Sequence, residues 1–226
     1  MYTEPTDTLA DERPNVNMSE HACSQKNEMT RKYELKLRAT RQEATRQRIV
    51  EAAVELHEKL GPARTSISAI AERAGVERLT VYRHFATEEE IFQACSAHFN
   101  ALHPFPDFPA WEAIDEPFAR LALGLTELYR YFAETERMLS AVIRDTPSTP
   151  AMHEPVAHLQ QELHAMLELL VTGFAMSGIA AERVQLPIRL ATDFQTWQIM
   201  VGEQGINTAE AVDYQLQVVH CAVDRS

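Results

Sequence analysis

Apolar side chains recur every three or four positions through most of the chain, which is the spacing of one face of an α-helix. The first such stripe runs from about Thr45 to Leu60, and Gly61-Pro62 ends it. Its apolar members are Ile49, Ala52, Ala53, Leu56 and Leu60. We therefore expect a packed helix over residues 45–60.

The next segment, residues 65–90, predicts two short helices joined by a tight turn. Apolar residues recur at helical spacing over residues 66–74 and again over residues 77–85. Gly75 separates the two segments. Glycine tolerates the positive φ of such a turn, so the pattern indicates a helix-turn-helix. Residues that favour helix starts stand where they are needed: Thr65, Ser66, and the capping box formed by Thr87 with Glu90.

The second of these short helices has an outward face suited to nucleic acid. Val81 and Phe85 lie four residues apart and should point into a three-helix core. The arc left outside carries Leu79, Thr80, Tyr82 and Arg83. A polar and aromatic arc on one helix is what a recognition helix presents to a DNA major groove.

The remaining two thirds of the chain also show helical spacing, and no strand-like alternation competes with it. The prediction is an all-α protein of about nine helices, with a three-helix helix-turn-helix DNA-binding domain over 41–87 and a larger helical ligand-binding and dimerisation domain over 88–226. The further helices are expected over residues 88–102, 114–134, 135–144, 151–176, 183–203 and 207–223.

The last two predicted helices are apolar on more than one face, so they need cover on both sides. The final helix carries a second stripe of Ala211, Tyr214, Val218 and Ala222. The simplest cover is the same helix pair of a second copy, packed as a four-helix bundle. We expect a homodimer whose interface includes Leu190, Trp197, Val201, Val212, Leu216 and Val219.

Residues 1–40 are polar and poor in large apolar side chains, which predicts a disordered tail, or a start codon at Met29. The tail's end is basic, with Arg31, Lys32, Lys36, Arg38 and Arg41. This stretch suits an arm that lies along DNA phosphates, and it equally suits a solvated basic segment.

The net charge of −12 is divided unevenly along the chain. Residues 31–85 hold 12 basic and 7 acidic side chains, whereas residues 86–226 hold 7 and 20. Positive charge is therefore concentrated at the helix-turn-helix, as phosphate binding requires. Three scattered cysteines and the lack of an 18-residue apolar run favour a cytoplasmic protein without disulfides or membrane contact.

Candidate chemistry in the large domain is sparse. The motif HEPVAH over 153–158 is one residue too long for a zinc protease helix, and no nucleophile elbow or phosphate-binding loop occurs. We expect no enzymatic activity, no cofactor and no metal. A cavity is better supported, because helices 114–134, 151–176 and 183–203 bring together Tyr129, Phe132, Met166, Leu170, Phe174, Phe194 and Trp197. These side chains equally suit a filled core.

Residues 45–92 resemble the DNA-binding domain of the tetracycline-repressor (TetR) family, and Thr-Val-Tyr-Arg-His-Phe over 80–85 carries most of the likeness. The resemblance implies a homodimeric repressor of a palindromic double-stranded DNA operator, released by a small-molecule effector. It implies phosphate or sugar contacts for Ser66, Thr80, Tyr82 and His84, base contacts for Ser68, Arg78, Leu79 and Tyr82, and DNA-facing positions for Thr45 and Arg83.

Two positions depart from the family pattern. Leu79 stands where small residues or proline are frequent, and Glu88 replaces the usual lysine at a helix start. A carboxylate cannot neutralise phosphate, so either that contact is lost or the basic arm compensates. Two functions stay open: a repressor released by a small, mostly apolar ligand, or a DNA-binding dimer whose large domain only dimerises or docks protein. A cavity of roughly 300 Å³ or more would favour the first.

Overall fold

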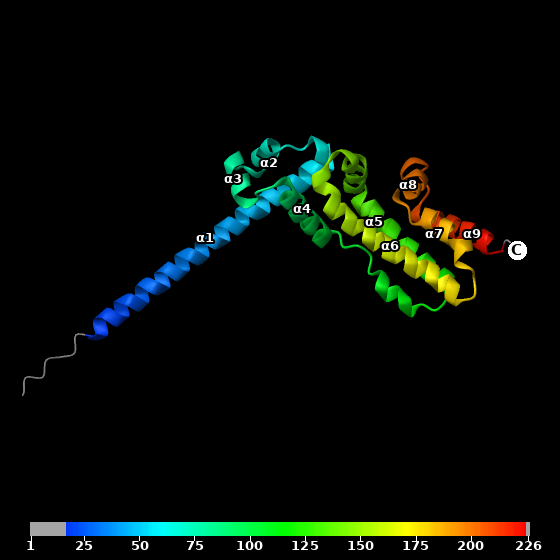
Figure 1. The fold of residues 1–226 in the computed structure, drawn as a ribbon, viewed down its shortest axis with the longest axis horizontal. Helices are drawn as coiled ribbons and strands as arrows, with labels where there is room; N and C mark the ends of the chain where they lie inside the picture. The colour runs from blue at the N-terminus through cyan, green and yellow to red at the C-terminus, as the bar shows by residue number, and fades with distance from the viewer. Residues whose placement is uncertain (1–16, 225–226) are drawn as a thin grey trace, which may run out of the picture. The chain divides into compact units, whose positions relative to one another are not determined.

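The computed structural model describes residues 17–224, and their side chains from residue 31 on. Within this range the regular structure is entirely helical, as predicted, with nine α-helices joined by short 3₁₀ and π segments (Figure 1). Residues up to Arg46 and residues from Gln47 on form two separate units, and each is described by itself. No helix between residues 17 and 224 is long and apolar enough to cross a membrane.

Helix α1, Asn17–Leu60, begins far before the predicted start near Thr45. Residues 17–40 are therefore helical in the structure, whereas the sequence predicted a disordered tail; residues 1–16 of that tail lie outside the described range. The segment is rich in Glu, Lys, Arg, Gln and Met, which are strong helix formers even without packing. All side chains from 31 to 44 are exposed, so this part of α1 buries no core of its own.

The helix-turn-helix region follows the sequence prediction closely. After the 3₁₀ turn η1, Pro62–Arg64, come α2, Ile67–Ala74, α3, Arg78–His84, and α4, Glu88–Leu102. Their apolar faces share one core with the end of α1, formed by Ile49, Val50, Ala52, Ala53, Ile67, Ile70, Ala71, Ala74, Val81, Phe85, Ile91 and Cys95. This core is local in sequence, which is why apolar spacing alone located it.

The larger helical region starts with η2, Phe108–Ala113, and the long helix α5, Pro117–Asp145. The sequence predicted two helices here, over 114–134 and 135–144. They are one helix because no glycine or proline separates them, and Thr135 donates its hydroxyl hydrogen bond to the Tyr131 carbonyl (2.6 Å) instead of starting a new helix. Two short 3₁₀ turns, η3 (Thr146–Ser148) and η4 (Pro150–Met152), lead into α6, His153–Met176.

The C-terminal third contains α7, Ala181–Ala191, α8, Phe194–Trp197, the π-helical segment η5, Gln198–Glu203, and α9, Thr208–Asp224. The predicted helix 183–203 is thus divided, because Asp193 accepts the backbone N–H of Thr196 (2.9 Å) and starts a new helix. Helices α5, α6, α7 and α9 pack around a second core that includes Trp111, Leu125, Tyr129, Phe174 and Trp197 (Figure 1).

The end of α5 is tied to the turn before the helix-turn-helix. Asp145, which is only 6% exposed, accepts the backbone N–H of Ala63 at 3.1 Å. Gly61 lies against the same carboxylate with φ at 89°, where a Cβ atom would overlap Arg144 Nη2 and Asp145 Oδ2. This turn directly precedes Ser66 and α2, so the last turn of α5 helps to position the helix-turn-helix.

Candidate DNA-binding surface and ligand cavity

The turn between α2 and α3 is held by local hydrogen bonds. Ser66 accepts the N–H of Ala69 at 3.2 Å and so caps α2. Gly75 adopts the left-handed conformation, with φ 65° and ψ 41°, and its N–H donates to the last carbonyls of α2. Val81 and Phe85 are 0% and 1% exposed, which fixes the rotation of α3 about its axis.

The predicted recognition face of α3 is exposed as expected. Leu79 and Tyr82 are 58% and 43% exposed, values that are high for an apolar and an aromatic side chain. Arg78 donates from Nη2 to the Tyr82 hydroxyl at 3.0 Å, and its guanidinium carbon lies 5.5 Å from the centre of the Tyr82 ring. This contact holds two potential DNA-contacting side chains together on one surface.

The other residues implied as DNA contacts occupy varied environments. Ser66, Ser68 and Arg83 are exposed, whereas Thr80 and His84 are half-buried. Thr45 belongs to the separate N-terminal unit, where its hydroxyl donates to the Arg41 carbonyl at 3.0 Å. Glu88, Glu89 and Glu90 are exposed in the first turn of α4, and Glu90 accepts the Ala86 N–H at 2.7 Å. Thr87 in turn accepts the Glu90 N–H at 3.3 Å, so Glu90 completes the predicted capping box.

Replacing Ser66 with alanine should lower the free energy of unfolding by about 1 kcal/mol, because the N–H of Ala69 loses its side-chain acceptor. Urea unfolding followed by circular dichroism measures this loss. Ser68→Ala, an exposed serine in the first turn of the same helix, is the matched control and should change stability by less than about 0.5 kcal/mol. Equal losses in the two variants would mean that the cap contributes nothing.

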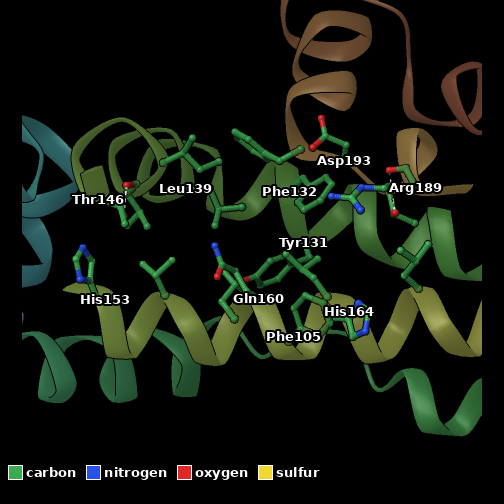
Figure 2. Close-up of a pocket in the computed structure, with 18 of the residues that line it drawn as sticks. Phe105, Tyr131, Phe132, Leu139, Thr146, His153, Gln160, His164, Arg189 and Asp193 are labelled. Carbon is green, nitrogen blue, oxygen red and sulfur yellow. Dashed lines mark hydrogen bonds between the residues drawn. The ribbon is translucent and has the colours of Figure 1, made fainter. Parts of the chain in front are cut away.

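A cavity of about 650 Å³ lies between α5, α6 and the α7–α8 connection (Figure 2). Its walls are mainly aromatic and aliphatic, with polar groups at both ends: Thr146 and His153 at one, Arg189 and Asp193 at the other. Burial raises the pKa of Tyr131 to about 12, so this phenol stays neutral near pH 7. A site of this size and composition suits a small organic molecule.

Sequence reasoning identified part of this lining. Of the predicted ligand contacts, Phe132 and Phe194 line the cavity. The others pack in the core and do not line it: Tyr129, Met166, Leu170, Phe174 and Trp197. The lining residues that were missed include His153, Gln160 and His164, which lie on the polar face of α6 and resemble an ordinary solvated stripe in the sequence.

The predicted dimer contacts divide in a similar way. Leu190 is 49% exposed, while Val201 and Leu216 are half-buried. Val212 and Val219 are buried within their own chain, because α9 packs against α5 and α7. Trp197 of α8 is buried too, and its ring contacts Phe132 and Phe194. These three side chains present almost no surface to a partner. Of the second stripe of α9, Ala211 is buried as well, whereas Tyr214, Val218 and Ala222 line a groove beside α7. Pro187, Gln217 and Cys221 complete the lining of this groove.

A buried histidine on the last turn of α1 packs against α4. His57 is 4% exposed and stacks on Phe92 with ring centroids 5.0 Å apart. Burial lowers its pKa to about 4, although the negative charge of Asp145 acts in the opposite direction. The imidazole is therefore neutral at physiological pH.

No cluster of three or more His, Cys, Asp or Glu that suits a metal ion occurs among the side chains described.

The sequence model of the bacterial regulatory proteins of the tetR family matches residues 49–95. Over these residues the chain carries the sequence pattern of the tetR family. The match begins within α1, contains α2 and α3, and ends in α4, so it coincides with the compact helix-turn-helix core.

Two regulators from Pseudomonas putida are similar in sequence to part of this chain. The HTH-type transcriptional regulator TtgR is 42% identical over 69 residues, which cover 30% of this chain and 33% of TtgR. The HTH-type transcriptional regulator SrpR is 38% identical over 84 residues, which cover 34% of this chain and 38% of SrpR. The chain thus matches little more than a third of the length of these curated relatives.

Solved structures are similar over most of the chain. The TetR-family regulator PfmR from Thermus thermophilus superposes with a TM-score of 0.56 at 18% identity, covering 78% of this chain and 94% of PfmR. A TetR-like regulator from a Rhodococcus species gives 0.56 at 15% identity, covering 80% of this chain and 97% of that regulator. At these identities the likeness concerns the fold, and it extends beyond the helix-turn-helix into the larger region.

Proposed function

We propose that this chain is a cytoplasmic transcriptional regulator that binds a palindromic operator as a homodimer and is released by a small, mostly apolar ligand. The observation that carries the proposal is the α3 surface, where Arg78, Leu79 and Tyr82 project from a helix fixed by buried Val81 and Phe85. Arginine suits the acceptors of guanine, and leucine suits the methyl group of thymine.

The cavity supports release by a ligand, because its volume of about 650 Å³ exceeds the roughly 300 Å³ that small-molecule sites typically need. Val142, Thr146 and Pro147 of its wall flank Asp145, whose carboxylate holds the Ala63 N–H ahead of α2. A molecule that displaces this wall would act on the turn that precedes the helix-turn-helix. The hydrogen bond gives the two regions a physical connection, as a coupling between sites requires.

The outward face of α7 and α9 supports dimerisation. Leu186, Leu190 and Tyr214 are between 49% and 63% exposed and lie beside the groove around Pro187 and Val218. Such an apolar face is best buried by its own copy, and two-fold symmetry suits a palindrome. A DNA-binding dimer without a ligand switch remains the second candidate, and an operator affinity that no cavity ligand changes would favour it.

Arg78→Ala should weaken binding to a duplex selected by the wild-type chain by about 1–3 kcal/mol and relax the preference at one base position, the range for one bidentate base contact. Band-shift titrations on the selected and on random duplexes measure both effects. Arg73→Ala is the control, since Arg73 is an exposed cation on α2 that pairs with Glu55. Equal weakening of Arg78→Ala on both duplexes would mean that Arg78 contacts only the DNA backbone.

A further inference from the structure

The cavity contains a permanent positive charge in a region that is otherwise acidic. Residues 86–226 hold only 7 basic side chains against 20 acidic ones, yet one of them, Arg189, belongs to the cavity lining. Figure 2 shows Arg189 extending from α7 at the end of the cavity where Asp193 also lies. Arginine offers five N–H donors in a planar fork that fits carboxylate and phosphate oxygens.

The acidic neighbour of Arg189 has a structural role. Asp193 accepts the Thr196 backbone N–H at 2.9 Å and the Thr196 hydroxyl at 3.4 Å through the same oxygen, so its carboxylate caps α8. Other polar groups of the lining, including Gln160 and His164 on α6, can donate or accept hydrogen bonds. Among the lining residues of the described cavity, Arg189 is thus the group best suited to attract an anion.

The remaining walls suit an apolar body. Phe105 and Tyr131 contact edge to face at 5.3 Å, and Phe132 contacts Phe194 in the same way at 5.3 Å. Leu139, Leu159 and Leu163 add aliphatic surface. The lining extends from Thr146 and His153 at one end to Arg189 at the other, so an elongated molecule can cross the apolar part and place one end at the guanidinium (Figure 2).

We propose that the cavity binds an elongated apolar molecule that carries a single anionic group, a carboxylate or a phosphate, and that Arg189 holds this group. The inference rests on the proposed function in taking the cavity as the effector site, and it adds the chemical class of the effector. Selectivity for an anion then follows from Arg189, while the aromatic and aliphatic walls supply most of the affinity.

Four ten-carbon probes that differ only in the head group test this proposal on the full chain: decanoate, decyl phosphate, decanol and decylamine, each below its micelle concentration. Isothermal titration calorimetry measures each dissociation constant. Tryptophan fluorescence supplies a second signal, because the ring centroid of Trp197 lies 5.5 Å from that of Phe194 and 5.8 Å from that of Phe132, and both phenylalanines line the cavity. We expect at least one of the two anions to bind at least about fivefold more tightly than decanol, with decylamine the weakest. The stronger of the two anions identifies the head group.

Arg189→Gln should lower the affinity for the preferred anion by about fivefold or more and leave decanol within about twofold. Arg183→Gln is the matched control, because Arg183 is an exposed residue of α7 outside the cavity lining. Arg189→Met, which keeps an apolar stem, serves if the glutamine variant fails to fold. Equal affinities for all four probes, tightest binding of decylamine, no binding at all, or an unaltered Arg189 variant would each overturn the proposal. These measurements contain no DNA, so their failure is distinct from a failure to find an operator.

Discussion

Between pH 6.5 and pH 4 the free energy of unfolding should fall by up to about 3 kcal/mol through His57 alone. The folded chain holds the pKa of His57 at about 4, below its usual value of 6.5, because the imidazole is buried against Phe92. Below pH 6.5 the unfolded chain therefore binds a proton that the folded chain does not. The contribution that neutral His57 makes to the free energy of unfolding is fully present above pH 6.5 and is lost as the pH falls toward 4.

Urea unfolding at a series of pH values measures this loss, and His57→Phe is the informative variant because a phenyl ring can still stack on Phe92. The variant should keep its stability between about pH 6.5 and 4.5 more fully than the wild type. His164→Phe, an exposed position on α6, is the control and should retain the wild-type slope. An unchanged pH dependence in His57→Phe would contradict the assignment of the slope to this residue.

Gly61→Ala should lower the free energy of unfolding by about 2–4 kcal/mol. Gly61 has φ 89° and ψ 153°, a backbone region that is essentially restricted to glycine. An added Cβ atom would also overlap Arg144 Nη2 and Asp145 Oδ2, and Asp145 is held in place by the Ala63 N–H. The loss therefore combines backbone strain with displacement of the carboxylate that connects α5 to the helix-turn-helix.

Gly178→Ala separates the two contributions. Gly178 has a similar φ of 83°, but nothing lies within 4 Å of the position that a Cβ atom would take. This variant should cost only about 1–2 kcal/mol of strain. Thermal or urea unfolding of both variants gives the comparison, and a loss for Gly61→Ala no larger than that for Gly178→Ala would show that the contact with Asp145 adds nothing to stability.

The helix-turn-helix could be predicted from the sequence because its determinants are local. Ser66, Gly75 and Thr87 mark helix ends through hydrogen bonds within four residues, and Val81 with Phe85 sets the buried face of α3. The wrong division of α5 has the opposite origin. Nothing in the sequence near Thr135 breaks a helix, so the predicted boundary there reflected only a change in the apolar spacing.

The cavity could be predicted only in part, because its lining depends on packing between distant segments. Aromatic stripes identify apolar faces, but they do not tell a filled core from a cavity wall: Tyr129 and Phe174 became core, while Phe132 and Phe194 became lining. The connection between Asp145 and Ala63 joins residues 82 positions apart. The spacing of apolar residues along the sequence gives no information about such a contact.

Selection of bound duplexes from a random DNA pool by the full chain tests the central claim most directly. The account predicts enrichment of one palindromic sequence whose two half-sites lie about one helical turn or a multiple of it apart. Arg78→Ala should enrich a more degenerate sequence at the guanine that Arg78 is proposed to contact. Binding without enrichment of any sequence, or no binding, would contradict the assignment of Arg78, Leu79 and Tyr82 as the surface that recognises an operator.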